Sequence, residues 1–120
     1  MNKLAELHNA HDLVMQFAEV GVEQFAAEAA GRTQTYNRLF DKMAAISQKL
    51  RDGNGRGALA ELYNHPNPQV RLKAAIHTLA IFPIEARRVL QDLVDRREYP
   101  QAGEARGMLR ALQRGTYVPD

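Results

Sequence analysis

Two proline-containing turns constrain the fold of this chain more than any other feature of its sequence. The first is a polar turn that follows Asn64 and leads through Pro68 into an alanine-rich segment. Proline cannot continue a helix but fits its first turn, so one helix is expected to end near Asn64 and the next to begin at Pro68 or Gln69. A similar Tyr-Pro-Gln turn returns at residues 99–101. The sequence therefore predicts a helical hairpin around each turn.

The two turns are separated by a fixed interval. Pro100 follows Pro68 by 32 residues, and Gln101 follows Gln69 by the same distance. A unit of helix, turn and helix cannot bury its apolar side alone, so units at a fixed period are expected to stack on one another. The pattern predicts an all-α superhelix of about six helices in antiparallel pairs.

Helices are expected wherever apolar residues recur every three or four positions, and no segment shows the strict alternation of a strand. Gly21 favours a bend or break in the first long helix. The residues predicted to share one apolar face of that helix are Leu13, Phe17, Val20, Phe25 and Ala29. We expect a short lead helix at 2–9, then helices at 13–29, 33–52 (from Thr33 or Thr35), 58–64, 68–82, 84–97 and 101–114.

Length and composition favour one ordinary domain. The chain has 120 residues, of which 45% are hydrophobic and 25% are charged, and this is enough apolar material for a core without the charge excess of a disordered chain. We expect a single domain over 1–120, with a lead segment at 2–11 and a loose tail at 115–120.

The residue types that are missing exclude several classes of protein. There is no cysteine, so disulfides and thiolate metal sites are ruled out. No apolar run approaches the length of a membrane span, and the first residues lack the apolar stretch of a signal peptide. We expect a cytoplasmic protein that has no contact with membranes and needs no cofactor.

The segment 68–82 has little polar surface, and a helix that is apolar on most sides is buried on most sides. It is therefore predicted to be the central helix. Arg71, near its start, has two possible roles. Its guanidinium can reach the carbonyls that end the preceding helix near Tyr63, or it can bind a carboxylate of a partner. We favour the structural role, because a buried charge must be paired.

The run from Pro68 to Ala75, Pro-Gln-Val-Arg-Leu-Lys-Ala-Ala, resembles the second helix of a HEAT repeat, in which a turn leads into Val-Arg and then small residues. HEAT repeats commonly place an aspartate in the turn, where it pairs with arginines along the stack. Asn64 and Asn67 occupy this turn instead, so the resemblance does not carry over that ladder of ion pairs.

A narrower resemblance rests on two runs together, Tyr-Asn-Arg-Leu-Phe-Asp-Lys at 36–42 and His-Pro-Asn-Pro-Gln-Val-Arg-Leu-Lys-Ala-Ala at 65–75. They resemble the small bacterial family called domain of unknown function 2019, over most of residues 12–114. The resemblance implies a HEAT- or armadillo-like fold and a bacterial origin. The family has no established activity, so the resemblance supplies no catalytic residue.

Residues that could carry catalysis or ligand binding do not form a recognised set. The glycine-rich run 53–57 lacks the lysine and the preceding strand of a phosphate-binding loop, although the helix start at Ala58 beside Arg56 offers an alternative anion site. His8 and His11 have a metal-ligand spacing but no third ligand nearby. Ser47 is the single serine, with no histidine–carboxylate pair to activate it. We predict a protein that is not an enzyme.

Basic residues are concentrated towards the C-terminal end of the chain. Arg106, Arg110 and Arg114 recur every four residues, so they line one face of a helix. Such a row can contact phosphates, and this keeps nucleic-acid binding open as an alternative. The net charge of only +2 and the interspersed carboxylates favour a solvated, salt-bridged face instead.

The sequence therefore favours a non-catalytic module that binds a protein or peptide. Stacked helical repeats present an extended concave groove that is lined by the second helix of each pair. The polar residues predicted to face this groove, and so to contact the partner, are Lys73, His77, Arg106 and Arg110.

Overall fold

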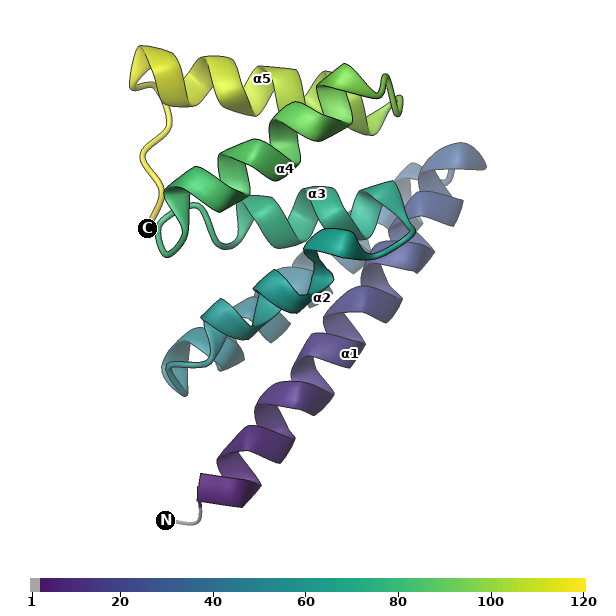
Figure 1. The fold of residues 1–120 in the computed structure, drawn as a ribbon. Helices are drawn as coiled ribbons and strands as arrows, with labels where there is room; N and C mark the ends of the chain where they lie inside the picture. Colours follow the sequence, from purple (N-terminus) through teal and green to yellow (C-terminus); the bar gives the residue numbers. More distant parts are fainter. Residues whose placement is uncertain (1–2) are drawn as a thin grey trace. The chain divides into compact units, whose positions relative to one another are not determined.

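In the computed structural model, the described backbone runs from Lys3 to Asp120, and side chains are described from Asn9 onward. This part of the chain is all-α, with five α-helices, one 3-10 helix and no strand (Figure 1). The predicted lead helix falls partly on residues 1–2, which lie outside the described part. The helices are α1 (Lys3–Ala29), α2 (Thr33–Asp52), η1 (Arg56–Asn64), α3 (Pro68–Ile76), α4 (Pro83–Asp95) and α5 (Gln101–Arg114).

The chain divides into two compact units. Unit 1 ends at Leu59, and unit 2 runs from Ala60 to Asp120. Unit 1 holds α1 and α2, which pack against each other as a hairpin. Unit 2 holds α3, α4 and α5, which all contact one another. Within the described residues, no helix is both long enough and apolar enough to cross a membrane.

The first helix is longer than the sequence predicts. The described part of the lead segment, from Lys3, and the segment 13–29 form one continuous helix, α1, and Gly21 does not interrupt it. Gly21 is buried within this helix. The low helix propensity of glycine therefore does not break the helix at this position.

The hairpin buries most of the apolar residues that recur every three or four positions in α2, although Phe40, expected in the same stripe, is 52% exposed. Leu39, Met43, Ile46 and Leu50 are all buried, each at most 5% exposed. In α1, by contrast, the predicted apolar face is only partly correct. Phe17 and Val20 are buried, whereas Phe25 is 36% exposed and Ala29 is exposed.

The predicted helix at 58–64 is a 3-10 helix, η1, that begins at Arg56. It is reached through a tight turn in which the backbone of Gly55 comes close to α1. A Cβ added at Gly55 would lie 3.4 Å from the Cβ of Ala10. This is the distance of an ordinary van der Waals contact, so Gly55 packs against α1 without space alone requiring a glycine.

In unit 2, the turn before α3 starts the helix as predicted. The Asn67 side chain accepts hydrogen bonds from the backbone N–H groups of Gln69, at 2.9 Å, and of Val70, at 3.4 Å, and Pro68 occupies the first turn. All residues from Gln69 to Ala75 are buried, including the polar ones. The expectation that the segment 68–82 is buried on most sides is correct for Gln69 to Ala75 and for Thr78 and Leu79, whereas Ala80 and Ile81 are exposed.

The helix α3 ends at Ile76, six residues earlier than predicted. Thr78 Oγ1 donates to the carbonyl of Ala74 at 2.8 Å, and the backbone then continues in turns up to Pro83. A threonine hydroxyl that bonds back to the preceding turn competes with the regular helical pattern. The apolar residues from Leu79 to Phe82 therefore lie in a turn rather than in a helix.

The core of unit 2 combines α3, α4 and α5. Tyr117, in the segment predicted to be a loose tail, is half-buried against this core, so the tail is held at that point. The fully or nearly fully buried members are Leu72, Ala75, Leu79, Ala86, Leu90, Leu93 and Ala105.

Candidate functional site

The four residues predicted to contact a partner have different environments. Arg106 and Arg110 are exposed on α5. His77 is half-buried directly after α3. Lys73, on α3, is only 5% exposed. The structure therefore places the two arginines at the surface and Lys73 beneath it.

Lys73 connects α3 to α5. Its Nζ lies 2.8 Å from Oε2 of Glu104, and the two side chains are 6% and 43% exposed. A buried ammonium needs such a partner, because an unpaired charge in the interior is strongly destabilising. The ion pair also holds Glu104 on the α3 side of α5, away from the exposed arginines of that helix. The sequence interpretation did not predict this pair.

The exposed face of α5 alternates between arginines and glycines. Arg106, Arg110 and Arg114 are exposed, and Gly103, before the first of them, and Gly107, between the first two, lie on the same side of the helix. A Cβ added at either glycine would meet nothing within 4 Å. Arg106 has one long contact, 3.4 Å from Nη2 to the hydroxyl of Tyr99. This side of α5 is therefore a shallow basic surface, which we call the α5 face.

The α5 face has a rigid support at the start of the helix. Gln101 is 2% exposed and Gln69 is 1% exposed, and Nε2 of Gln101 donates to Oε1 of Gln69 at 3.0 Å. The bond joins the first turns of α3 and α5, the two helices that follow the proline turns. The 32-residue interval between the glutamines was visible in the sequence, but their mutual hydrogen bond was not predicted.

Arg71 has the structural role that we favoured. Its Nε donates to the carbonyl of His65 at 2.8 Å, and its two terminal nitrogens bind both carboxylate oxygens of Glu98 at 2.8 and 2.7 Å. A guanidinium matches a carboxylate in this two-bond geometry. The hydrogen bonds from Arg71 lower the pKa of Glu98, and the same bonds raise the pKa of Arg71. The carboxylate thus comes from this chain rather than from a partner.

A cleft of about 570 Å³ lies beside this ion pair in unit 2. Its lining carries charges of both signs. Burial raises the pKa of Tyr63, whose hydroxyl is hydrogen-bonded to Thr78. His65 accepts a hydrogen bond on Nδ1 from the backbone of Asn67 at 3.1 Å, which fixes its ring in the turn. The charged residues of the lining are Arg71, Glu85, Arg88, Asp92, Arg96 and Glu98.

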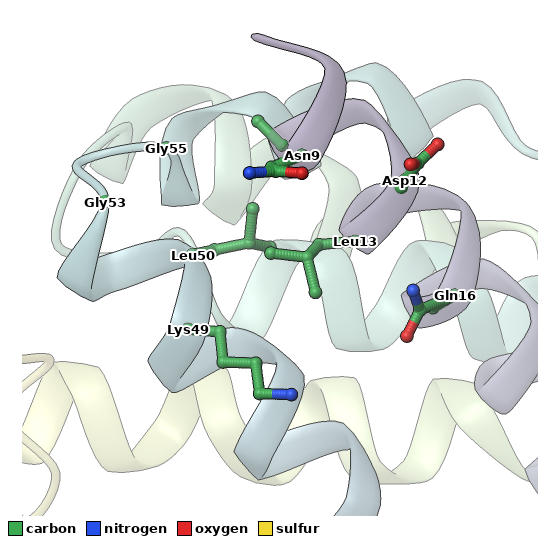
Figure 2. A pocket seen from close by; sticks show the side chains of 9 residues that line it. Asn9, Asp12, Leu13, Gln16, Lys49, Leu50, Gly53 and Gly55 are labelled. Atoms are coloured by element: carbon green, nitrogen blue, oxygen red, sulfur yellow. The ribbon is translucent and has the colours of Figure 1, made fainter. Parts of the chain in front are cut away.

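A second cleft, of about 490 Å³, lies within unit 1 between the start of α1 and the end of α2 (Figure 2). Leu13 and Leu50 face each other at its centre, and the polar side chains of Asp12, Gln16 and Lys49 surround them. Gly53 and Gly55, from the glycine-rich run, form part of the rim. Ser47 is buried on α2.

The residues considered for metal binding do not gather. Among residues whose side chains are described, no three histidine or carboxylate residues come close enough to hold an ion. The side chain of His8 lies outside the described residues, so the pairing of His8 with His11 is not placed by the structure.

The fold and these surfaces define a small protein that is all-α over its described residues. The family model described as Domain of unknown function (DUF2019) matches residues 11–113. The chain therefore belongs to this family, as the runs at 36–42 and 65–75 indicated.

A solved structure supports the same conclusion. The chain is similar to the protein RPA1889 from Rhodopseudomonas palustris CGA009, with 44% sequence identity and a TM-score of 0.89. The similarity covers 92% of this chain and 93% of that chain. A search of curated proteins finds no match.

Proposed function

We propose that this protein is a non-catalytic binding module and that the α5 face holds a helical segment of a protein partner. The observation that carries the proposal is the pair Gly103 and Gly107. Each glycine in an exposed helix is less stable than alanine by about 0.5–1 kcal/mol. Open space surrounds both positions, so packing within this chain does not account for them. A partner whose backbone approaches α5 closely would account for both.

The charges on the α5 face indicate an acidic partner. Arg106, Arg110 and Arg114 present three guanidinium groups along about 12 Å of helix, at a rise of 1.5 Å per residue. The carboxylate in this part of α5, Glu104, is held by Lys73. Lys73 therefore supports the proposed site from behind, and His77, half-buried after α3, is a neighbour of that support rather than a contact residue.

We further propose that unit 2 is a divergent HEAT-like stack of a short superhelix, in which α4 and α5 form one helical pair and α3 is the second helix of the pair before it. The hydrogen bond between Gln69 and Gln101 supports this proposal, because it joins equivalent positions 32 residues apart. The pair of Arg71 and Glu98 supplies the arginine–carboxylate contact that HEAT repeats make with a turn aspartate. In this architecture α5 is the second helix of its pair, which is the helix that lines the groove.

Replacing the two glycines tests the proposed site. Gly103→Ala/Gly107→Ala should raise the free energy of unfolding by about 1–2 kcal/mol, because alanine is the better helix former. The same substitution should weaken binding of a stapled acidic amphipathic helix by about tenfold or more, because two methyl groups block the close approach. Binding is measured by fluorescence anisotropy at low salt, and stability by urea unfolding.

The matched controls separate shape from charge. Arg106→Glu/Arg110→Glu should abolish binding of the acidic helix, and a peptide with lysine in place of each glutamate should not bind the wild type. A double alanine variant that binds as tightly as the wild type would exclude the glycine surface from the site. Unchanged affinity after the charge reversal would remove the arginines.

The arginine row also supports a second candidate function, which is binding of a nucleic-acid backbone. Three guanidinium groups at regular spacing can contact successive phosphates. Exposed carboxylates on the neighbouring helix α4, among them Asp92 and Asp95, oppose this reading. Retention of a short DNA or RNA duplex that falls steeply with salt would support it. The absence of any gel shift at low salt would eliminate it.

A further inference from the structure

The helix α1 has a second apolar stripe, separate from the one that is buried in the structure. Met15, Val22 and Phe25 are 50%, 43% and 36% exposed. With Ala29, which is exposed, and Ala18, which is 7% exposed and borders the buried face, they recur at intervals of 3, 4, 3 and 4 residues, which is the spacing of a coiled-coil seam. We call these five residues the α1 seam. Exposed apolar side chains in a row, rather than scattered singly, indicate a docking surface.

The α1 seam has an acidic border. Asp12, Glu19 and Glu23 lie along one edge of it and are exposed, and residues 9–29 contain no lysine or arginine. Basic groups of unit 1 lie near two of these carboxylates, since Lys49 lines a cleft with Asp12, and Arg32 and Arg38 line one with Glu23. The exposed edge of the seam on α1 itself is acidic.

This border disfavours pairing of α1 with the α1 of another copy, because only acidic edges would face each other, and like charges on adjacent helices repel. The occupant needs basic residues at helical spacing and little side-chain bulk between them. The α5 face has both properties. Arg106 and Arg110 are four residues apart, as are Glu19 and Glu23, so both pairs span about 6 Å of helix.

The shapes of the two surfaces also agree. Gly103 and Gly107 leave hollows on the α5 face, and the α1 seam presents the large side chains Val22 and Phe25. Packing of large side chains into spaces between residues of a facing helix is the usual geometry of helix pairs. Close approach at the glycines would let the arginines reach the acidic border.

We propose that the partner of the α5 face is the α1 seam of a second copy of this chain, so that copies associate head to tail. This proposal rests on the proposed function, because it names the segment that the α5 face binds. The contact joins two different surfaces, so one association leaves a free α1 seam at one end and a free α5 face at the other. Further copies can then add, as a ring or an open chain.

Sedimentation velocity of the full-length chain over a range of concentrations tests the proposal. The wild type should form dimers and larger species at low salt, and these should dissociate as salt rises, since exposed charges are screened. Glu19→Lys/Glu23→Lys and Arg106→Glu/Arg110→Glu should each be monomeric. Gly107→Gln should also be monomeric while more stable to urea than the wild type, which separates a blocked surface from a damaged fold.

Mixing the two charge-reversed variants gives the decisive result. Each retains the surface that the other has lost, and the two reversed surfaces are complementary to each other, so the mixture should form dimers and larger species in which the two variants alternate. A chain that carries all four reversals should regain the self-association of the wild type. No dimer in the mixture, or larger species in either variant alone, would overturn the head-to-tail contact.

The stapled acidic helix distinguishes this proposal from the proposed function. A wild type that stays monomeric at every concentration but still binds the acidic helix refutes self-association and keeps the α5 face as a binding site. A wild type that does neither refutes both proposals. A wild type that associates, with association unaffected by the α5 charge reversal, refutes the assignment of the α5 face as the contact.

Discussion

The interior of unit 1 and the interior of unit 2 are stabilised by different kinds of contact. The α1–α2 hairpin of unit 1 relies on an apolar stripe in which leucine, methionine and isoleucine side chains are buried. Unit 2 also has an apolar core, but it adds buried polar pairs that join α3 to its neighbours, among them Gln69 with Gln101 and Arg71 with Glu98. Apolar burial favours a compact state without fixing one register, whereas paired polar groups must meet in one arrangement. The polar pairs of unit 2 therefore fix the arrangement of α3 against its neighbours.

The largest expected effect tests the apolar part of this comparison. Leu79→Ala in unit 2 should lower the free energy of unfolding by about 2–5 kcal/mol, because Leu79 is 2% exposed within the core. Leu50→Ala, at a position in unit 1 that is 1% exposed, is the matched variant. Urea unfolding measures both. A loss below about 1 kcal/mol at Leu79 would contradict its central position.

The next effect tests the polar part. Glu98→Gln should destabilise the protein at neutral pH by about 1–3 kcal/mol, because Arg71 then lacks a charged partner. The fold lowers the pKa of Glu98, so the stability that this carboxylate contributes is present above its ordinary pKa of about 4.5 and is lost as the pH falls through its folded value. The unfolding free energies of wild type and variant should therefore converge in acid. A difference that does not change with pH would indicate that the ion pair contributes little.

The smallest effect concerns the turn that starts α3. Asn67→Ala should lower the free energy of unfolding by about 1 kcal/mol, because the two backbone N–H groups that donate to the Asn67 side chain would lose their acceptor. Asn67→Asp is the control, since aspartate caps a helix equally well. Thermal unfolding of the three proteins measures the difference. Equal stability of the alanine and aspartate variants would show that the cap is not needed once the core of unit 2 is formed.

The sequence was sufficient to predict the helix class and most helix boundaries. The proline turns mark the starts of α3 and α5 because proline acts locally, within one turn of the chain. The sequence did not predict the early end of α3, because a threonine at position 78 neither favours nor excludes a helix. In the folded chain, the Thr78 hydroxyl donates a hydrogen bond to the carbonyl of Ala74. The continuity of α1 was missed because the low helix propensity of glycine favours a break at Gly21, whereas the helix continues through this residue.

The candidate site was harder to predict, because the sign of a side chain's charge does not show whether that side chain is buried or exposed. Lys73 and Arg106 look alike in the sequence, yet Lys73 is buried in an ion pair and Arg106 is exposed. Gly103 and Gly107 were overlooked, although two glycines four residues apart in a helix were a readable signal. The exposed α1 seam was hidden for a related reason, since α1 carries apolar residues around much of its circumference.

The hydrogen bond between Gln69 and Gln101 has a consequence for how such a chain can grow. An amide side chain both donates and accepts, so a glutamine can bind an identical glutamine in the next copy of the same helical unit. An arginine or a glutamate cannot do this, because each needs a different residue opposite. Duplication of the helical repeat would therefore also duplicate a compatible contact, without any new mutation. Because each added repeat would carry its own glutamine, it could form the same hydrogen bond with the repeat before it.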